Sequence, residues 1–419
     1  MKNFRPMKRR TLRLSAAACA LALASLSASA QSGATRPRRV TPVQPTTTDT
    51  AAGGASNTGN AANAGGAANA AGARTGAATP VGSAAGATTA HAFSLLQQKQ
   101  YEAALREARE VASADGKNAE AYKIAGFAQF YMKQYPQAAE DLRRSLDLRK
   151  AEGGKDPDAE RALAQAYLFA EDYERALPLL AAATAPGSKP DADMLYYRAV
   201  AEMNLKKTAE AERSFAEVLK VDPKNKFALL YTGQLAYARG DYTAAINALN
   251  RATLADPTMA QAWQFLVTAY LSRAKGAAQA AADADYLAAV RAADSLARVR
   301  NDAQSAALQG QALFFAKQYV RAAAALERAA ASPNAPEGTH YLLGYSYVQA
   351  KNFPKATTAL EQAAAKTPAD ADIYRLLGYT YETQKQYAKA LAAYEKGLQL
   401  VPGDAYFTES AGRVRPFAK

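Results

Sequence analysis

The sequence is poor in the residues that carry metal and thiol chemistry: its 419 residues include one cysteine and two histidines. Neither His91 nor His340 has a second histidine or a cysteine at ligand spacing, so we expect no metal site. Both fall on the apolar stripes described below, and we interpret them as packing residues. The chain also lacks a Gly-x-x-x-x-Gly-Lys-Ser/Thr phosphate loop and a Gly-x-Ser-x-Gly nucleophile motif. These absences predict a protein that is not an enzyme and has no cofactor.

The excess of positive charge is small outside the N-terminal region. The net charge is +13, but residues 1–30 contribute six positive charges and residues 31–84 contribute three, which leaves +4 for the remainder. Basic residues such as Arg143 and Arg144 are interleaved with acids such as Glu140 and Asp147. Nucleic-acid-binding domains usually carry a basic patch or stripe. We therefore expect no nucleic-acid partner.

Long apolar runs are missing as well. The run from Leu14 to Leu26 follows six basic residues and precedes Ala28-Ser29-Ala30, which is typical of a secretory signal peptide over residues 1–30. It is short and serine-rich for a membrane-spanning helix. A retained N-terminal anchor is the alternative, and membrane contact is expected only through this segment. Cys19 lies inside the apolar run rather than after it, so a lipid anchor is not expected.

Cleavage after Ala30 predicts an exported protein, periplasmic or extracellular, without disulfides. Residues 31–84 then form a linker, first proline-rich and afterwards rich in alanine, glycine, asparagine and threonine. Such a composition cannot bury enough apolar surface to fold. As a flexible coil, this segment spans roughly 40 Å.

The rest of the chain repeats a short phrase, Lys-Gln-Tyr-x-x-Ala. Its aromatic residue is Tyr101, Tyr135, Tyr319 and Tyr387 in four close copies, and Tyr173, Tyr242 and Phe353 in three looser ones. The spacings are 34, 38, 69, 77, 34 and 34 residues, and the two long gaps each hold one weaker copy. A fixed period near 34 residues indicates a stack of similar small units.

Alignment on this phrase gives nine units, at residues 85–118, 119–156, 157–191, 192–225, 226–259, 260–302, 303–336, 337–370 and 371–404. In the last unit an apolar stripe with the spacing of one helix face comprises Tyr374, Leu377, Gly378 and Tyr381. A second helix follows, with Ala390, Tyr394 and Gly397, and Pro402 comes after its end. We expect the small residues to let the two helices approach closely. Residues 405–419 form a C-terminal cap or tail, without a clear polar capping helix.

Unit six is longer than the others because of extra residues around Arg273–Asp285. We expect a longer second helix that starts after Gly276. A bend in the stack, or a protrusion that docks a partner, are the alternatives.

This pattern resembles the tetratricopeptide repeat (TPR) family over residues 85–404, about three quarters of the chain. The resemblance implies an all-α, right-handed solenoid of nine helix–turn–helix repeats. It also implies a concave groove, lined by the first helix of each unit, that binds an extended or helical peptide. The groove residues that it implies are Phe127, Phe130, Tyr196, Tyr237, Gln264, Gln311, Tyr341, Tyr345, Arg375 and Tyr379. We expect Tyr341, Tyr345 and Tyr379 to matter most.

TPR domains that hold a C-terminal carboxylate use paired lysine and asparagine residues. Here Lys123 is followed by Phe127 instead of asparagine, so this clamp is not expected. The resemblance therefore predicts a non-catalytic scaffold or adaptor that assembles a protein complex in the cell envelope. The alternative is an accessory protein that binds or exports envelope polysaccharide or peptidoglycan, because stacked tyrosines and amides also suit sugar rings. Oligomeric state is left open.

Overall fold

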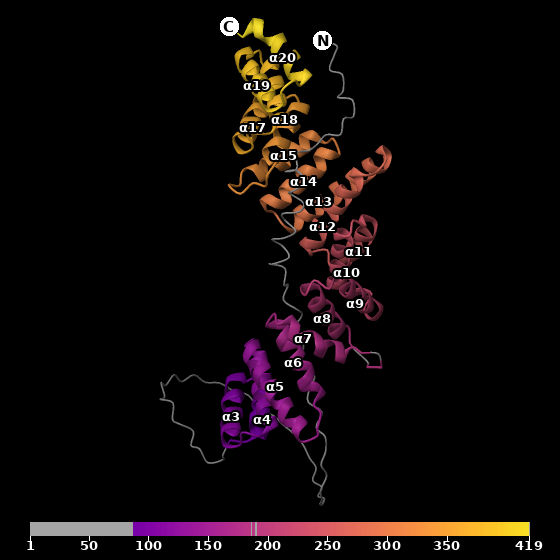
Figure 1. Ribbon diagram of the computed structural model, residues 1–419, viewed down its shortest axis with the longest axis vertical. Coiled ribbons are helices and arrows are strands. Elements are labelled where there is room, and N and C mark those ends of the chain that lie inside the picture. The colour runs from indigo at the N-terminus through magenta and orange to yellow at the C-terminus, as the bar shows by residue number, and fades with distance from the viewer. Residues whose placement is uncertain (1–86, 186, 189–190, 419) are drawn as a thin grey trace, which may run out of the picture. The chain divides into compact units, whose positions relative to one another are not determined.

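A computed structural model describes residues 87–185, 187–188 and 191–418, and these form an array of nineteen α-helices followed by one short 3₁₀ helix (Figure 1). The all-helical fold expected from the sequence is confirmed. The expected signal peptide (1–30) and linker (31–84) lie outside the described residues. Within the part of the chain that the structure describes, no helix is long and apolar enough to cross a membrane.

Each of the nine units holds two helices. The helices of units one to four are α2 (Thr89–Gln97), α3 (Tyr101–Ala114), α4 (Ala119–Tyr131), α5 (Tyr135–Ala151), α6 (Pro157–Phe169), α7 (Tyr173–Ala183), α8 (Ala192–Asn204) and α9 (Thr208–Val221). Those of units five to nine are α10 (Lys226–Ala238), α11 (Tyr242–Ala255), α12 (Ala260–Lys275), α13 (Gln279–Val299), α14 (Ala303–Phe315), α15 (Tyr319–Ala330), α16 (Thr339–Gln349), α17 (Phe353–Lys366), α18 (Ala371–Thr383) and α19 (Tyr387–Leu400). The chain ends with α20 (Ala405–Val414) and the 3₁₀ helix η1 (Arg415–Phe417).

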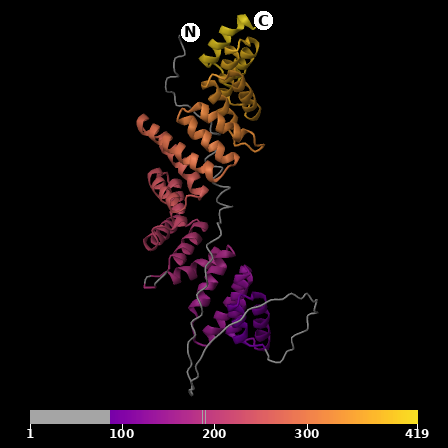
Figure 2. The ribbon, with the colours of Figure 1, turned by 180° about the vertical axis from the view of Figure 1, so that it is seen from behind.

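The described residues fall into two compact units of structure. One contains α2 to α7 and residues 200–207, and the other contains residues 191–199 and everything from Thr208 onward. In the second, the helices from α10 to α20 stack in chain order, and the view from behind shows the same succession (Figure 2). A continuous apolar core runs through this stack from Leu229 to Val414. Each helix therefore obtains its buried surface from its neighbours, which is how repeat arrays are stabilised.

The repeated phrase folds into one specific turn between the two helices of a unit. Its lysine adopts a left-handed backbone conformation, with φ of 59° at Lys317, 58° at Lys351 and 60° at Lys385. In unit seven the Lys317 N–H donates to the carbonyl of Phe314 and the Gln318 N–H donates to the carbonyl of Leu313, both at 2.9 Å. This pair of hydrogen bonds closes the end of a helix in a Schellman motif. The aromatic residue of the phrase is then the first residue of the next helix.

The weaker copy of the phrase in unit four lacks the aromatic residue but forms the same turn. Lys206 has φ of 60° and α9 begins two residues later, at Thr208. Unit five uses Gly240 at this position, with φ of 83°. Glycine adopts this conformation with little strain, whereas an L-residue with a side chain pays about 1–2 kcal/mol. The turn thus keeps its shape in eight of the nine units although its residue type changes; unit six is the exception, because Gly276 between its helices has φ of −97°.

Glycines let the two helices of a unit approach closely. A methyl group on Gly344 of α16 would lie 2.5 Å from Cγ of Leu360 on α17, and one on Gly378 of α18 would lie 2.2 Å from Cε1 of Tyr394 on α19. Leu360 and Tyr394 are fully buried. The same contact recurs at Gly126, Gly233 and Gly310. The expectation that small residues allow close helix contact is confirmed.

The aromatic residue of the phrase connects neighbouring units. The ring of Tyr101 stacks on that of Tyr131 in the next unit at 4.8 Å between centroids, and the Tyr135 ring lies 5.2 Å from that of Phe169. In unit six Tyr286 plays this part, stacking on Phe315 at 5.4 Å. Aromatic pairs of this kind contribute about 0.5–1.5 kcal/mol beyond their buried area.

Unit six accommodates its extra residues in both helices. α12 extends to Lys275 and α13 starts at Gln279 and spans 21 residues, so a long second helix after Gly276 is what the structure shows. The two helices project beyond their neighbours in Figures 1 and 2. Arg273 fixes the base of this projection through two hydrogen bonds to the buried Asp285, at 2.9 and 2.6 Å.

The last residues form a capping helix, contrary to our expectation that none is present. Phe407, Ala411 and Val414 of α20 are buried, whereas Glu409 and Arg413 on the same helix are exposed. The Phe407 ring fits against Gly397 of α19. This helix was not predicted from the sequence because it comprises only ten residues. A polar outer face is what terminal repeats need.

Candidate partner-binding surface

The predicted groove residues of unit two are largely buried. Phe127 and Phe130 of α4 expose only 7% and 8% of their surface. The Phe130 ring lies 5.5 Å from that of Tyr135 and 5.8 Å from that of Phe169. These side chains hold units together and leave little surface for a partner.

The contacts of Lys123 give the physical reason why a carboxylate clamp is not expected here. Its side chain is buried, and its Nζ lies 2.8 Å from a carboxylate oxygen of Asp156, the last residue of unit two, which caps the first helix of the following unit. A second carboxylate, that of Glu120, lies 3.8 Å away. The charge is therefore satisfied inside the stack, where a buried cation needs a partner.

Tyr196 belongs to an aromatic cluster at the junction of units four and five. Its ring lies within 6.3 Å of those of Tyr197, Phe215, Phe227 and Tyr231. Burial, together with the neighbouring Tyr231, raises the pKa of Tyr196 well above its usual value. The hydroxyl therefore stays protonated over the whole physiological range.

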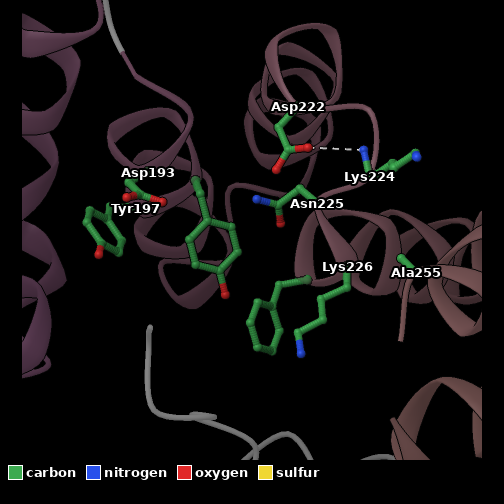
Figure 3. Close-up of a pocket in the computed structure, with 9 residues that line it drawn as sticks. Asp193, Tyr197, Asp222, Lys224, Asn225, Lys226 and Ala255 are labelled. Carbon is green, nitrogen blue, oxygen red and sulfur yellow. Dashed lines mark hydrogen bonds between the residues drawn. The ribbon is translucent and has the colours of Figure 1, made fainter. Parts of the chain in front are cut away.

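A small hollow of about 240 Å³ adjoins this cluster (Figure 3). Aromatic and charged residues share its lining: Asp193, Tyr196, Tyr197, Asp222, Lys224, Asn225, Lys226, Phe227 and Ala255. The Lys224 N–H donates to the Asp222 carboxylate at 3.2 Å, the bond drawn in Figure 3. Lys226 lies 2.5 Å from Asp256. The hollow has room for one side chain of a partner.

The next two predicted residues make contacts within the stack. The hydroxyl of Tyr237 lies 3.1 Å from Oγ of Ser272, and its ring lies 5.4 Å from that of Tyr242. Gln264 is buried, and its Oε1 accepts a hydrogen bond from Nη2 of Arg300 at 3.1 Å. Tyr237 keeps part of its surface accessible, whereas Gln264 does not.

Tyr341 and Tyr345 of α16 form the densest aromatic group of the predicted set. The Tyr345 ring lies 5.0 Å from that of Phe314, 6.3 Å from that of Tyr341 and 6.5 Å from that of Tyr319. Both tyrosines are partly exposed, and so is Gln311 of α14. Burial raises the pKa of Tyr341, and the nearby carboxylates of Asp372 and Asp370 raise it further. This group offers aromatic surface and hydroxyl donors that remain neutral.

Arg375 and Tyr379 of α18 differ in how they are held. The Arg375 guanidinium lies 3.2 Å from Asp404 and 3.4 Å from Asp372, and it stacks over the rings of Tyr406 and Phe407 at 4.6 and 4.7 Å. It therefore fastens the capping helix. Tyr379 is partly exposed, with its ring 6.2 Å from that of Phe353.

The two histidines differ from each other. His340 is buried, as expected of a packing residue. His91 is not: 64% of its side chain is exposed, and its Nδ1 contacts the carboxylate of Glu107. The packing interpretation is wrong for His91: α2 is the first helix described, and among the described residues no earlier unit packs against this stripe.

Asp141 is a buried carboxylate that is paired with a cation. Burial raises the pKa of Asp141, but one of its oxygens is 2.6 Å from Nη2 of Arg109, which lowers that pKa in turn. Such a pair is an internal contact between units. In residues 87–185, 187–188 and 191–418, no three metal-binding side chains gather into a site.

Comparison with protein families decides the nature of the array. A family model described as tetratricopeptide repeat matches residues 161–226, 201–260, 230–297 and 341–405. These residues are tetratricopeptide repeats. A second model, described as anaphase-promoting complex, cyclosome, subunit 3, matches residues 283–363. No curated protein matches the sequence.

Several solved structures are similar to parts of the chain. YrrB, described as a TPR protein with an unusual peptide-binding site, has 16% identity and a TM-score of 0.42, over 47% of this chain and 97% of its own. A TPR protein from Parabacteroides merdae has 15% identity and a TM-score of 0.39, over 62% and 98%. MamA from Desulfovibrio magneticus has 22% identity and a TM-score of 0.37, over 43% and 98%.

TPR proteins bind protein or peptide partners and are typically non-catalytic scaffolds, so this array is a scaffold for protein–protein interaction. In that setting, the predicted residues divide into two kinds. Phe127, Phe130, Gln264 and Arg375 make structural contacts within the stack. Tyr196, Tyr237, Gln311, Tyr341, Tyr345 and Tyr379 are partly exposed, and their role in binding stays a prediction.

Two features were missed by the sequence reasoning. The hollow beside Tyr196 brings together residues from α8, α10 and α11 that no single motif connects. The left-handed backbone conformation of the lysines in the repeated phrase was not predicted, because lysine itself does not indicate that conformation.

Proposed function

We propose that this TPR scaffold is an exported, non-catalytic adaptor of the cell envelope, which holds a segment of a protein partner along the first helices of its C-terminal units. The observation that carries the proposal is the aromatic group of Tyr341 and Tyr345, which is packed by Phe314 and Tyr319 yet keeps exposed surface. Interface residues that contribute most are usually aromatic and held in place before binding.

Export is supported by the pattern of residues 1–30, which lie outside the described residues. It predicts a mature protein that begins at Gln31. Mass spectrometry of the protein recovered from the envelope fraction checks this. A full-length N-terminus in the cytoplasmic fraction contradicts the envelope assignment without affecting the scaffold assignment.

The binding surface is tested by in-cell crosslinking of wild type and the Tyr341→Ala/Tyr345→Ala variant, with captured proteins identified by mass spectrometry. Loss of two anchors is expected to weaken partner binding by about 2–4 kcal/mol. The matched control is Tyr286→Ala/Phe315→Ala, which removes another partly exposed ring pair. Urea unfolding establishes that each variant still folds.

A partner lost only in the Tyr341→Ala/Tyr345→Ala variant supports the proposal. A folded variant that captures the same proteins as wild type contradicts it. In that case, binding of the purified protein to isolated wall polymer is measured next. Binding supports a function in polysaccharide or peptidoglycan binding, and no binding indicates that the surface is inactive.

A further inference from the structure

The turns between the paired helices of units seven, eight and nine share one charge pattern. The left-handed residue is an exposed lysine in all three: Lys317, Lys351 and Lys385. The third residue of the following helix is an exposed cation in all three: Arg321, Lys355 and Lys389. We name these six residues the basic edge. The first turns of α15, α17 and α19 contain no acidic residue.

This pattern runs against the electrostatics of the helices themselves. The first turn of a helix carries partial positive charge, so acids stabilise it and cations destabilise it. Three other second helices follow the rule, with Glu102 in α3, Glu174 in α7 and Glu210 in α9, whereas α5, α11 and α13 have no acid in the first turn. The helix dipole favours a lysine at the C-terminal end of each first helix, but it does not favour a cation in the first turn of the second helix. Residues that break a local preference are candidates for functional sites.

Internal ion pairs neutralise only part of this charge. Arg321 pairs with Asp294 at 3.2 Å, and Lys355 pairs with Glu327 at 2.9 Å. The ammonium of Lys389 lies over the Tyr381 ring at 5.5 Å. Among the described residues, Lys317, Lys351 and Lys385 have no carboxylate within ion-pair distance. Three cations in successive units therefore face solvent without a counter-charge.

The three turns follow one another along one side of the second unit of structure. α14 contacts α16 and α16 contacts α18, so the turns at the ends of these helices are neighbours in the same order. Packed helices lie about 8–10 Å apart, whereas an extended chain advances about 3.3–3.6 Å per residue. About three residues of an extended segment thus span the step from one turn to the next. Val320, 73% exposed beside Lys317 and Arg321, adds apolar surface.

We infer that the basic edge binds an extended, acidic segment of the protein partner, with a carboxylate at about every third residue. The inference rests on the proposed protein-binding function and specifies the chemistry of the partner. It concerns a surface that borders the Tyr341 and Tyr345 group, since Tyr319 begins the helix that carries Arg321 and also contacts the Tyr345 ring. The segment would run across the three turns.

The test measures fluorescence anisotropy of a labelled peptide with glutamate at every third position, titrated with the full chain. A peptide with glutamine in place of each glutamate is the ligand control. Lys317→Gln/Lys351→Gln/Lys385→Gln removes the unpaired cations. Lys99→Gln/Lys133→Gln/Lys206→Gln removes the same charge from the same left-handed position in units one, two and four, and is the matched control.

We expect the first variant to bind the acidic peptide about tenfold more weakly than wild type, because each exposed ion pair contributes a few-fold. The control variant should bind as wild type does. Binding should also weaken from about 0.1 M to about 1 M salt, where the Debye length falls from about 10 Å to about 3 Å.

Three results overturn the inference: no binding of the acidic peptide by wild type, equal binding of the glutamine peptide, or equal loss in both lysine variants. The last result shows attraction by net charge alone. None of them bears on the adaptor proposal itself, because the crosslinking experiment identifies a partner through Tyr341 and Tyr345 whatever its charge.

Discussion

Replacement of Gly378 by alanine tests the close helix contact that a glycine makes in five of the nine units. The added methyl carbon would lie 2.2 Å from Cε1, 2.4 Å from Cδ1 and 2.7 Å from Cζ of Tyr394. These distances are far below van der Waals contact, so the ring or the helix must move. The ring is fully buried, and its hydroxyl donates to Glu382 at 2.8 Å, which itself accepts hydrogen bonds from Arg413.

The magnitude follows from three contributions to the free energy of unfolding. Overpacking of a core costs about 1–3 kcal/mol. Displacement of the Tyr394 hydroxyl from Glu382 costs about 1 kcal/mol more. Alanine has a helix propensity about 1 kcal/mol better than glycine, which offsets part of this. We expect Gly378→Ala to lower stability by about 1–3 kcal/mol.

Gly412→Ala is the matched control, because Gly412 is also helical but has no atom within 4 Å of the added methyl group. It should raise stability by about 1 kcal/mol through helix propensity alone. Urea unfolding of the full chain measures both variants. Since long repeat arrays can unfold in more than one step, hydrogen exchange of α18 and α19 locates the change. A Gly378→Ala protein as stable as wild type refutes the packing argument.

Two further predictions concern the left-handed turn and the buried histidine. Lys351→Gly should be about 0.5–1 kcal/mol more stable than Lys351→Ala, because both changes remove the charge but only glycine relieves the left-handed strain. Gly240→Ala should destabilise the protein by a similar amount. Equal urea midpoints for the two Lys351 variants would contradict this explanation. Burial lowers the pKa of His340, and its Nδ1 has no hydrogen-bond partner, so the unfolded chain binds the proton more readily than the folded one. Stability should therefore be full above about pH 6.5 and fall as the pH drops below it, and His340→Leu should reduce this loss. Urea midpoints measured at about pH 7.5 and about pH 5.5 check the difference, and an unchanged pH dependence in His340→Leu contradicts it.

The periodic sequence determines the helices well because each unit combines several agreeing signals. The apolar stripe, the small residue at its centre and the aromatic residue of the phrase all point to the same pair of helices. Gly378 and Tyr394 illustrate this: the sequence places one on each helix, and the structure brings them into contact. Local and global preferences agree at such positions, so position in the repeat suffices.

The surface was less predictable because one repeat position serves different purposes in different units. The fifth position is a buried, paired Lys123 in unit two, a partly exposed Tyr341 in unit eight and a cap-binding Arg375 in unit nine. The partner lies in a later part of the chain: Asp156 pairs with Lys123, and Asp404 pairs with Arg375. Such partners differ between units, so periodicity cannot assign them.

The contact between α19 and α20 has a consequence for how many molecules this array can join. Loss of residues 405–419 by proteolysis would uncover Tyr394 and Gly397, a face shaped to receive another helix. Contacts between unlike ends of identical molecules do not close into a ring unless the rotation between copies allows it, and otherwise continue as open filaments. With α20 in place, Phe407 covers this face, so a contact of this kind through α19 would first require α20 to be displaced.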